Sequence, residues 1–302
     1  MGRPNRFTVM EKNKDIVIQY ISALNKHIFT FDNVNSLLTD LKENNILLKS
    51  TKLSDFFTFL RDNQIVTSID IKLPKRGTTR YLFESPSVFE VALSLNKKAY
   101  LSHYTAIFLH HLTDHVPKKI YINAEQAEKY FYYDEDEILQ QKNIDLAFSR
   151  PMRETNQIAS FELNNQKYEI YMLNGKNQKR IGVIDLEIEG KIIPVAGIER
   201  TLIDAVVRPG YAGGVHEVLI AFEEARGKFS VNKMLSMLKK MNFRYPYHQL
   251  IGFYLERSGY QEKVLKLLDQ FAIEHDFYLT YQMRDKNYSS RWKVFYPKEL
   301  DE

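Results

Sequence analysis

The sequence predicts an α+β protein with two domains of unequal size. The first observation is an apolar period of helical type, which recurs three times between residues 17 and 60. The second is a change to strand-like alternation over residues 65–83, and the third is a mixture of helix-like and strand-like segments from residue 88 onward. A length of 302 residues also fits about two domains.

Three short amphipathic helices are expected in the first of these regions. Apolar residues stand at positions i, i+3, i+4 and i+7 of Val17–Leu24, Val34–Leu41 and Leu53–Leu60. This spacing gives each helix one apolar stripe, and the stripe must be covered by another element. The three helices are therefore expected to form one common core.

A β-hairpin is expected directly after the third helix. Residues 65–73 alternate between apolar and polar, residues 74–79 hold the proline and glycine of a turn, and residues 80–83 return as a short strand. Three helices followed by a hairpin are the layout of a winged helix-turn-helix domain. We place this domain at residues 1–85 and a larger mixed α+β domain at residues 86–302.

The larger domain is expected to begin with helices and strands and to end mainly in helices. Strand-like segments occur at Lys119–Asn123 and Ile158–Leu163, and Lys167–Leu173 and Ile181–Val195 are expected to form a hairpin or a meander. Glycines between the later segments predict turns at those positions. The expected later helices are Ile198–Val207, Val215–Ala225, Val231–Met241, Tyr247–Ser258 and about Glu262–His275.

The net charge of +4 is concentrated in the N-terminal domain. Residues 1–85 hold 13 Lys and Arg against 9 Asp and Glu, so this domain carries the whole excess and the remainder is neutral. A small basic domain beside a neutral one is compatible with binding to a nucleic acid.

The predicted DNA contacts lie on the third helix and on the hairpin. In a winged helix the third helix enters the major groove, and the hairpin touches the backbone or the minor groove. Basic side chains would neutralise phosphates there, and hydroxyl groups would donate hydrogen bonds to them. The alternative is a winged helix that contacts proteins. The candidate residues are Lys49, Ser50, Thr51, Lys52, Thr58, Arg61, Lys72, Lys75, Arg76, Thr78, Thr79 and Arg80.

Several classes of chemistry are excluded or disfavoured. Cysteine is absent, which excludes disulfides, thiolate metal sites and a cysteine nucleophile. The common phosphate-binding and serine-hydrolase motifs are missing, and His111 and His115 lack the intervening glutamate of a zinc motif. We therefore expect no cofactor and no metal. The first 30 residues hold no apolar signal segment, and no run of about 18 apolar residues occurs, so we expect a cytoplasmic protein without a membrane partner.

One segment leaves an enzymatic alternative open. Asp185, Glu189 and Lys191 have the order of the acidic and basic residues in metal-dependent nucleases of the restriction-enzyme type. Such a triplet is frequent by chance in a chain rich in lysine and glutamate. These three residues thus have two interpretations. They are either part of a solvated hairpin tip, or they indicate a nucleic-acid-processing enzyme with a nuclease-like C-terminal domain.

Two sequence blocks resemble the AbiEi antitoxin family of type IV toxin–antitoxin and abortive-infection systems. Residues 197–214 read G-I-E-R-T-L-I-D-A-V-V-R-P-G-Y-A-G-G, similar to the E-R-T-L-I-D and R-P-x-Y-x-G-G signature of that family. Residues 100–106, Y-L-S-H-Y-T-A, and residues 111–117, H-L-T-D-H-V-P, are similar to a second family block. The resemblance covers roughly residues 98–225, and His111 stands where the family usually has glycine.

The resemblance implies an antitoxin and autorepressor used in phage defence, not an enzyme. In that family an N-terminal winged helix binds inverted repeats in double-stranded operator DNA and represses its own promoter. The C-terminal domain counteracts a nucleotidyltransferase-like toxin, usually encoded by the adjacent gene, without a stable complex.

The family motif on the expected helix 198–207 also has a physical interpretation. Arg200 and Asp204 are four positions apart and can pair on one helical face. The negative charge of Glu199 suits the first turn of a helix. These residues are expected either to anchor the fold or to form a surface for toxin neutralisation, without catalysis. The motif residues are Glu199, Arg200, Thr201 and Asp204.

Overall fold

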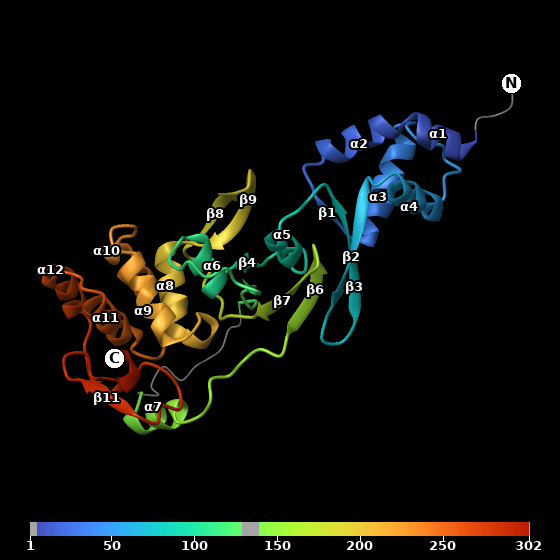
Figure 1. Ribbon diagram of the computed structural model, residues 1–302. Coiled ribbons are helices and arrows are strands. Elements are labelled where there is room, and N and C mark those ends of the chain that lie inside the picture. Colours follow the sequence, from blue (N-terminus) through green and yellow to red (C-terminus); the bar gives the residue numbers. More distant parts are fainter. Residues whose placement is uncertain (1–4, 129–138, 302) are drawn as a thin grey trace. The chain divides into compact units, whose positions relative to one another are not determined.

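The computed structural model describes residues 5–128 and 139–301 (Figure 1). Its contacts divide the chain into two compact units. The first unit consists of Met1–Leu95 and Ile158–Glu169, and the second of Asn96–Gln157 and Ile170–Glu302. Both units combine helices with strands, so the predicted α+β class is confirmed.

The first unit begins with four helices, of which the sequence predicted the last three. These are α2, α3 and α4, and their apolar stripes form one core that includes Val17, Leu41 and Phe56. α3 is capped by Thr30 and Asn33, whose side chains each accept the other residue's backbone N–H. The four helices are α1 (Arg6–Lys12), α2 (Lys14–Ala23), α3 (Phe31–Glu43) and α4 (Leu53–Asp62).

The predicted hairpin of the first unit is present and is longer than expected on its second strand. β2 (Val66–Lys72) and β3 (Gly77–Phe83) are antiparallel and pair from Val66 with Phe83 to Lys72 with Gly77. Two further strands join it. β1 (Ile28–Phe29), between α2 and α3, pairs with β3, and β6 (Ile158–Leu163) pairs with β2. The strand order within this unit is β1-β3-β2-β6.

The first unit also extends beyond residue 85, where the sequence analysis placed the boundary. α5 (Val88–Leu93) is capped by Ser87 and Glu90. The Arg80 guanidinium on β3 donates hydrogen bonds to the hydroxyl and the backbone carbonyl of Ser94 at the end of α5. α5 is therefore tied to the hairpin, and the first segment of this unit runs to Leu95.

The sheet of the second unit is mixed. β4 (Tyr100–Leu101) pairs antiparallel with β5 (Lys119–Asn123) and parallel with β9 (Lys191–Ala196). β8 (Val183–Ile188) forms a hairpin with β9. β7 (Gln166–Leu173) is next to β5, and its residues from Ile170 onward belong to this unit.

A group of helices forms the core of the second unit (Figure 1). A small three-stranded sheet follows these helices in the sequence. The core joins Leu202 of α8, Phe222 of α9, Leu235 of α10 and Tyr254 of α11. The helices are α6 (His103–Leu109), α7 (Gln141–Phe148), α8 (Ile198–Val207), α9 (Val215–Glu224), α10 (Val231–Met241), α11 (Tyr247–Arg257) and α12 (Glu262–Leu265), and the strands of the small sheet are β10 (Phe277–Tyr278), β11 (Lys286–Ser289) and β12 (Val294–Pro297).

The small sheet packs closely on α11. A Cβ atom at Gly252 would lie 2.3 Å from the Trp292 ring, so a larger residue at this position cannot be accommodated without displacing the ring. The Trp292 indole N–H donates a hydrogen bond of 2.8 Å to Glu256. In the part of the chain that the structure describes, no helix has the length and apolar character needed to cross a membrane.

Candidate functional site

Most of the predicted DNA contacts are exposed on the first unit. Lys52 occupies the N-cap position of α4, and Thr58 and Arg61 lie on its exposed side. The Arg61 Nε forms an ion pair with the Asp62 Oδ1 at 3.3 Å. The tip of the β2–β3 hairpin has no acid of its own. The exposed candidates are Lys49, Ser50, Lys52, Thr58, Arg61, Lys72, Lys75 and Arg76.

The structure corrects the placement of two predicted contacts, Thr51 and Arg80. Both are buried, with exposed fractions of 2% and 8%. The Arg80 guanidinium donates to the Thr78 hydroxyl at 2.7 Å and to the Thr79 carbonyl at 3.1 Å, besides its bonds to Ser94. Burial lowers its pKa below the ordinary value. Sequence pattern placed Arg80 on the hairpin but could not show that its guanidinium turns inward.

The two threonines on β3 are half-buried and already have partners. Thr78 accepts the bond from Arg80, and the Thr79 hydroxyl donates to the Asp70 carboxylate on β2 at 2.7 Å. The two threonines therefore contribute to the structure of the hairpin. The exposed cationic side chains at this end of the unit belong to Lys72, Lys75 and Arg76. These side chains, unlike the backbone carbonyl of Arg76, make no hydrogen bond or ion pair with any residue that the structure describes.

The family-motif residues on α8 are all buried in the second unit. Arg200 and Asp204 form the expected pair: the Arg200 Nε lies 2.9 Å from both oxygens of the Asp204 carboxylate. The other guanidinium nitrogens donate to the Ile181 carbonyl at 2.8 Å and to the Tyr100 hydroxyl at 3.0 Å. Burial alone would lower the pKa of Arg200, but Asp204, Tyr100 and Glu125 outweigh it and raise that pKa.

Glu199 and Thr201 also connect α8 to neighbouring elements. Burial alone would raise the pKa of Glu199, but hydrogen bonds lower it. Its carboxylate accepts the Ser230 backbone N–H and the Lys233 ammonium at the start of α10, the latter at 3.0 Å. The Thr201 hydroxyl donates to the Ala196 carbonyl at the end of β9. The motif therefore joins strands and helices, and of the two roles expected for it these contacts favour an anchor of the fold.

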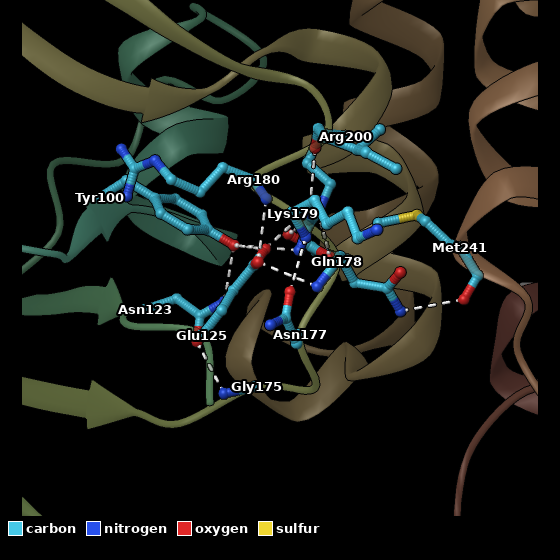
Figure 2. Close-up of polar contacts among 12 residues, drawn as sticks. Tyr100, Asn123, Glu125, Gly175, Asn177, Gln178, Lys179, Arg180, Arg200 and Met241 are labelled. Atoms are coloured by element: carbon cyan, nitrogen blue, oxygen red, sulfur yellow. Dashed lines mark hydrogen bonds and ion pairs between the residues drawn. The ribbon is translucent and has the colours of Figure 1, made fainter. Parts of the chain in front are cut away.

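Glu125, which the sequence analysis did not identify, completes this polar network. Its carboxylate accepts the backbone N–H groups of Gln178 and Arg180, both at 2.9 Å, and lies 3.5 Å from the Arg200 guanidinium (Figure 2). Asn123 holds the same loop by accepting the N–H of Gly175. A carboxylate with only 7% of its side chain exposed needs such partners, so the network orders the loop between β7 and β8.

A cleft of about 1080 Å³ lies beside this network, entirely within the second unit. It is lined by residues from α6, β5, β7, α8, α11 and neighbouring loops and turns. Basic side chains outnumber acidic ones, and an aromatic group forms part of the wall. The lining includes basic Arg153, Lys176, Arg200, Arg208 and Arg244, acidic Glu154 and Asp204, and aromatic Tyr211, Phe243, Tyr245 and Tyr247.

His103 at the start of α6 is the histidine in this lining. It is 6% exposed, and its Nδ1 lies 3.0 Å from the Ser102 hydroxyl. Burial lowers its pKa to about 4, so the imidazole is neutral near pH 7. Its φ of +49° lies in the left-handed region, a conformation that is costly for a residue with a side chain and that often occurs at functional sites.

The residues of the nuclease alternative lie on the β8–β9 hairpin. Asp185 is exposed on β8, and Glu189 is exposed in the turn with a φ of +52°. α6 ends at Leu109, so the same helix does not present His111 and His115. In residues 5–128 and 139–301 no three His, Asp or Glu side chains are grouped as a metal ion requires.

Comparison with known proteins gives a fold similarity. No family model and no curated protein matches the chain. The crystal structure of the RV2827C protein from Mycobacterium tuberculosis is similar with a TM-score of 0.57 and 12% sequence identity. The similarity covers 94% of this chain and 91% of that chain. At this identity the likeness concerns the fold alone.

Proposed function

We propose that the chain is an AbiEi-like antitoxin that also binds its own promoter DNA and represses transcription. The first unit would act as a winged helix-turn-helix domain on inverted repeats. The second unit would counteract a nucleotidyltransferase-like toxin, without catalysis and without a stable complex. Such a repressor acts where the chromosome is, in the cytoplasm.

The observation that carries the DNA-binding part is the arrangement of the first unit. The order of α2, β1, α3, α4 and the β2–β3 hairpin, with β1 paired to β3, supports a winged helix. α4 would be its recognition helix and the hairpin its wing. The exposed Lys72, Lys75 and Arg76 on the hairpin are suited to neutralise phosphates.

The antitoxin part rests on the resemblance of residues 98–225 and on the separation of charges. The excess of basic residues lies in the N-terminal region. The motif residues on α8 form hydrogen bonds and ion pairs within their own unit. Repression and neutralisation would therefore use different parts of the chain, and they can be tested separately.

The test is a separation-of-function experiment with a Lys75→Ala/Arg76→Ala variant. Cells carry a reporter under the chain's own promoter and the adjacent toxin gene under an independent inducible promoter. We expect the variant to lose repression, because two phosphate contacts are removed, and to keep protecting cells from the toxin. Reporter output and growth after toxin induction measure the two activities.

A Lys97→Ala/Lys98→Ala variant is the matched control. Both lysines are exposed, and the charge change is the same, but they lie in the second unit. This variant is expected to repress normally. Full repression by the Lys75→Ala/Arg76→Ala variant would contradict the wing assignment, and a failure of the wild type to protect against the toxin would contradict the antitoxin assignment.

A further inference from the structure

The cleft of the second unit contains cationic groups that the fold does not use. Arg200 is saturated by Asp204, Ile181 and Tyr100. In contrast, the side chains of Arg153 and Arg208 make no hydrogen bond or ion pair with any residue in the described ranges. Arg208, at the C-terminal end of α8, is half-buried. Its charge is therefore partly desolvated without a compensating partner in the described part of the chain, which is unfavourable in free energy.

Neutral donors lie in the same lining. Tyr247 is 6% exposed, and its hydroxyl has no hydrogen-bond partner among the described residues. Burial raises the pKa of Tyr247, so the hydroxyl keeps its proton. His103 keeps a neutral imidazole, held by Ser102 through Nδ1. Arg208 lines the same cleft as both groups, and its positive charge acts to lower the pKa of each.

The Asp204 carboxylate does not neutralise Arg208. Both of its oxygens are bound by the Arg200 Nε at 2.9 Å. The lining therefore offers two guanidinium groups, of Arg153 and Arg208, and the Tyr247 hydroxyl, all without a partner among the described residues. The remaining acidic residue of the lining, Glu154, is exposed. Guanidinium groups bind the oxygens of phosphates and carboxylates in pairs of parallel hydrogen bonds, so a phosphate group fits them.

The cleft also has an apolar, aromatic side. Phe243 and Tyr245 are half-buried between α10 and α11, and Phe243 packs edge-on against Tyr247 with ring centroids 5.3 Å apart. Aromatic rings provide a stacking surface for a nucleobase. The volume of about 1080 Å³ is slightly above the range of roughly 300–1,000 Å³ that is usual for small-ligand sites.

We propose that this cleft binds a nucleotide, with its phosphate groups on Arg208 and Arg153 and its base against Phe243 and Tyr245. The nucleotide is either free or the end of a single strand, since both present the same phosphate and base. The proposal concerns the second unit alone and does not depend on operator binding by the first unit.

The experiment measures binding of ATP, inorganic phosphate and a short single-stranded oligonucleotide to the full chain by calorimetry. It compares the wild type with Arg208→Gln and with Arg226→Gln, an exposed arginine in the same unit that is outside the cleft lining. We expect ATP to bind the wild type more tightly than phosphate does. Arg208→Gln should weaken ATP binding by about tenfold to a hundredfold, since a charge-assisted pair is lost, while Arg226→Gln should leave it unchanged.

The thermal transition of each variant verifies that it is folded. If Arg208→Gln does not fold, Arg153→Gln at the exposed side of the cleft provides the same test. Tight binding of the oligonucleotide with weak binding of ATP would assign the site to a strand. The absence of binding by all three probes up to about 1 mM, or an equal loss in Arg226→Gln, would overturn the proposal.

Discussion

The β2–β3 hairpin of the first unit and helix α8 of the second unit both concentrate charge in a short stretch, but they use it in opposite ways. Lys72, Lys75 and Arg76 on the hairpin are exposed. On α8, Arg200 and Asp204 are buried and bind each other. A charge without an internal partner is available to a ligand, whereas the fold is destabilised when one member of a buried pair is removed. The strength of a sequence motif therefore does not distinguish binding from anchoring, whereas the presence or absence of an internal partner does.

The largest effect on stability is expected from Arg200→Met, which removes the buried ion pair between Arg200 and Asp204. The change leaves Asp204 and Glu125 buried without their guanidinium partner, so the free energy of unfolding should fall by about 3–5 kcal/mol. Urea unfolding followed by circular dichroism measures it. Lys75→Met on the hairpin is the control and should change stability by less than about 0.5 kcal/mol. An equal loss of unfolding free energy in Arg200→Met and Lys75→Met would contradict the proposed difference between the two charged regions.

A smaller effect is expected from the pH dependence of His103. Its pKa is about 4 in the folded state and 6.5 ordinarily, so between these values the unfolded chain binds more protons. The stability that His103 contributes is present above pH 6.5 and is lost as the pH falls towards 4, by up to about 3 kcal/mol.

A His103→Asn variant tests this assignment, because asparagine tolerates the left-handed backbone. Urea unfolding at pH 7 and pH 5 should show a smaller difference in stability for the variant than for the wild type. His216→Asn, at an exposed position, should retain the wild-type difference. An unchanged pH dependence in His103→Asn would show that the imidazole is not held neutral.

Elements with a strong local period were predictable, and short or non-local ones were not. α8 and α10 have the bounds that their apolar periods predict, Ile198–Val207 and Val231–Met241. β1 was missed because two residues carry no period, and its formation depends on β3. The expected helix over about residues 262–275 is wrong in extent: α12 ends at Leu265 and continues as a short 3₁₀ helix, Lys266–Gln270.

The candidate sites were predictable only where exposure follows from the local pattern. Lys75 and Arg76 stand in a turn, and turns are exposed. The inward direction of Arg80 depends on Ser94, which lies in a helix the sequence analysis assigned to the other domain. The cleft could not be predicted, because its lining comes from segments between His103 and Tyr247 that only the tertiary fold brings together.

The salt dependence of operator binding tests most directly the claim that exposed cations on the hairpin bind DNA while buried ones hold the fold. Fluorescence polarisation with double-stranded DNA from the chain's own promoter gives the slope of log affinity against log salt. Lys75→Ala/Arg76→Ala should make this slope shallower by about 0.9 for each lost phosphate contact, and Arg80→Gln, if folded, should leave it unchanged. An unchanged slope in the double variant, or an equal change in Arg80→Gln, would contradict the account.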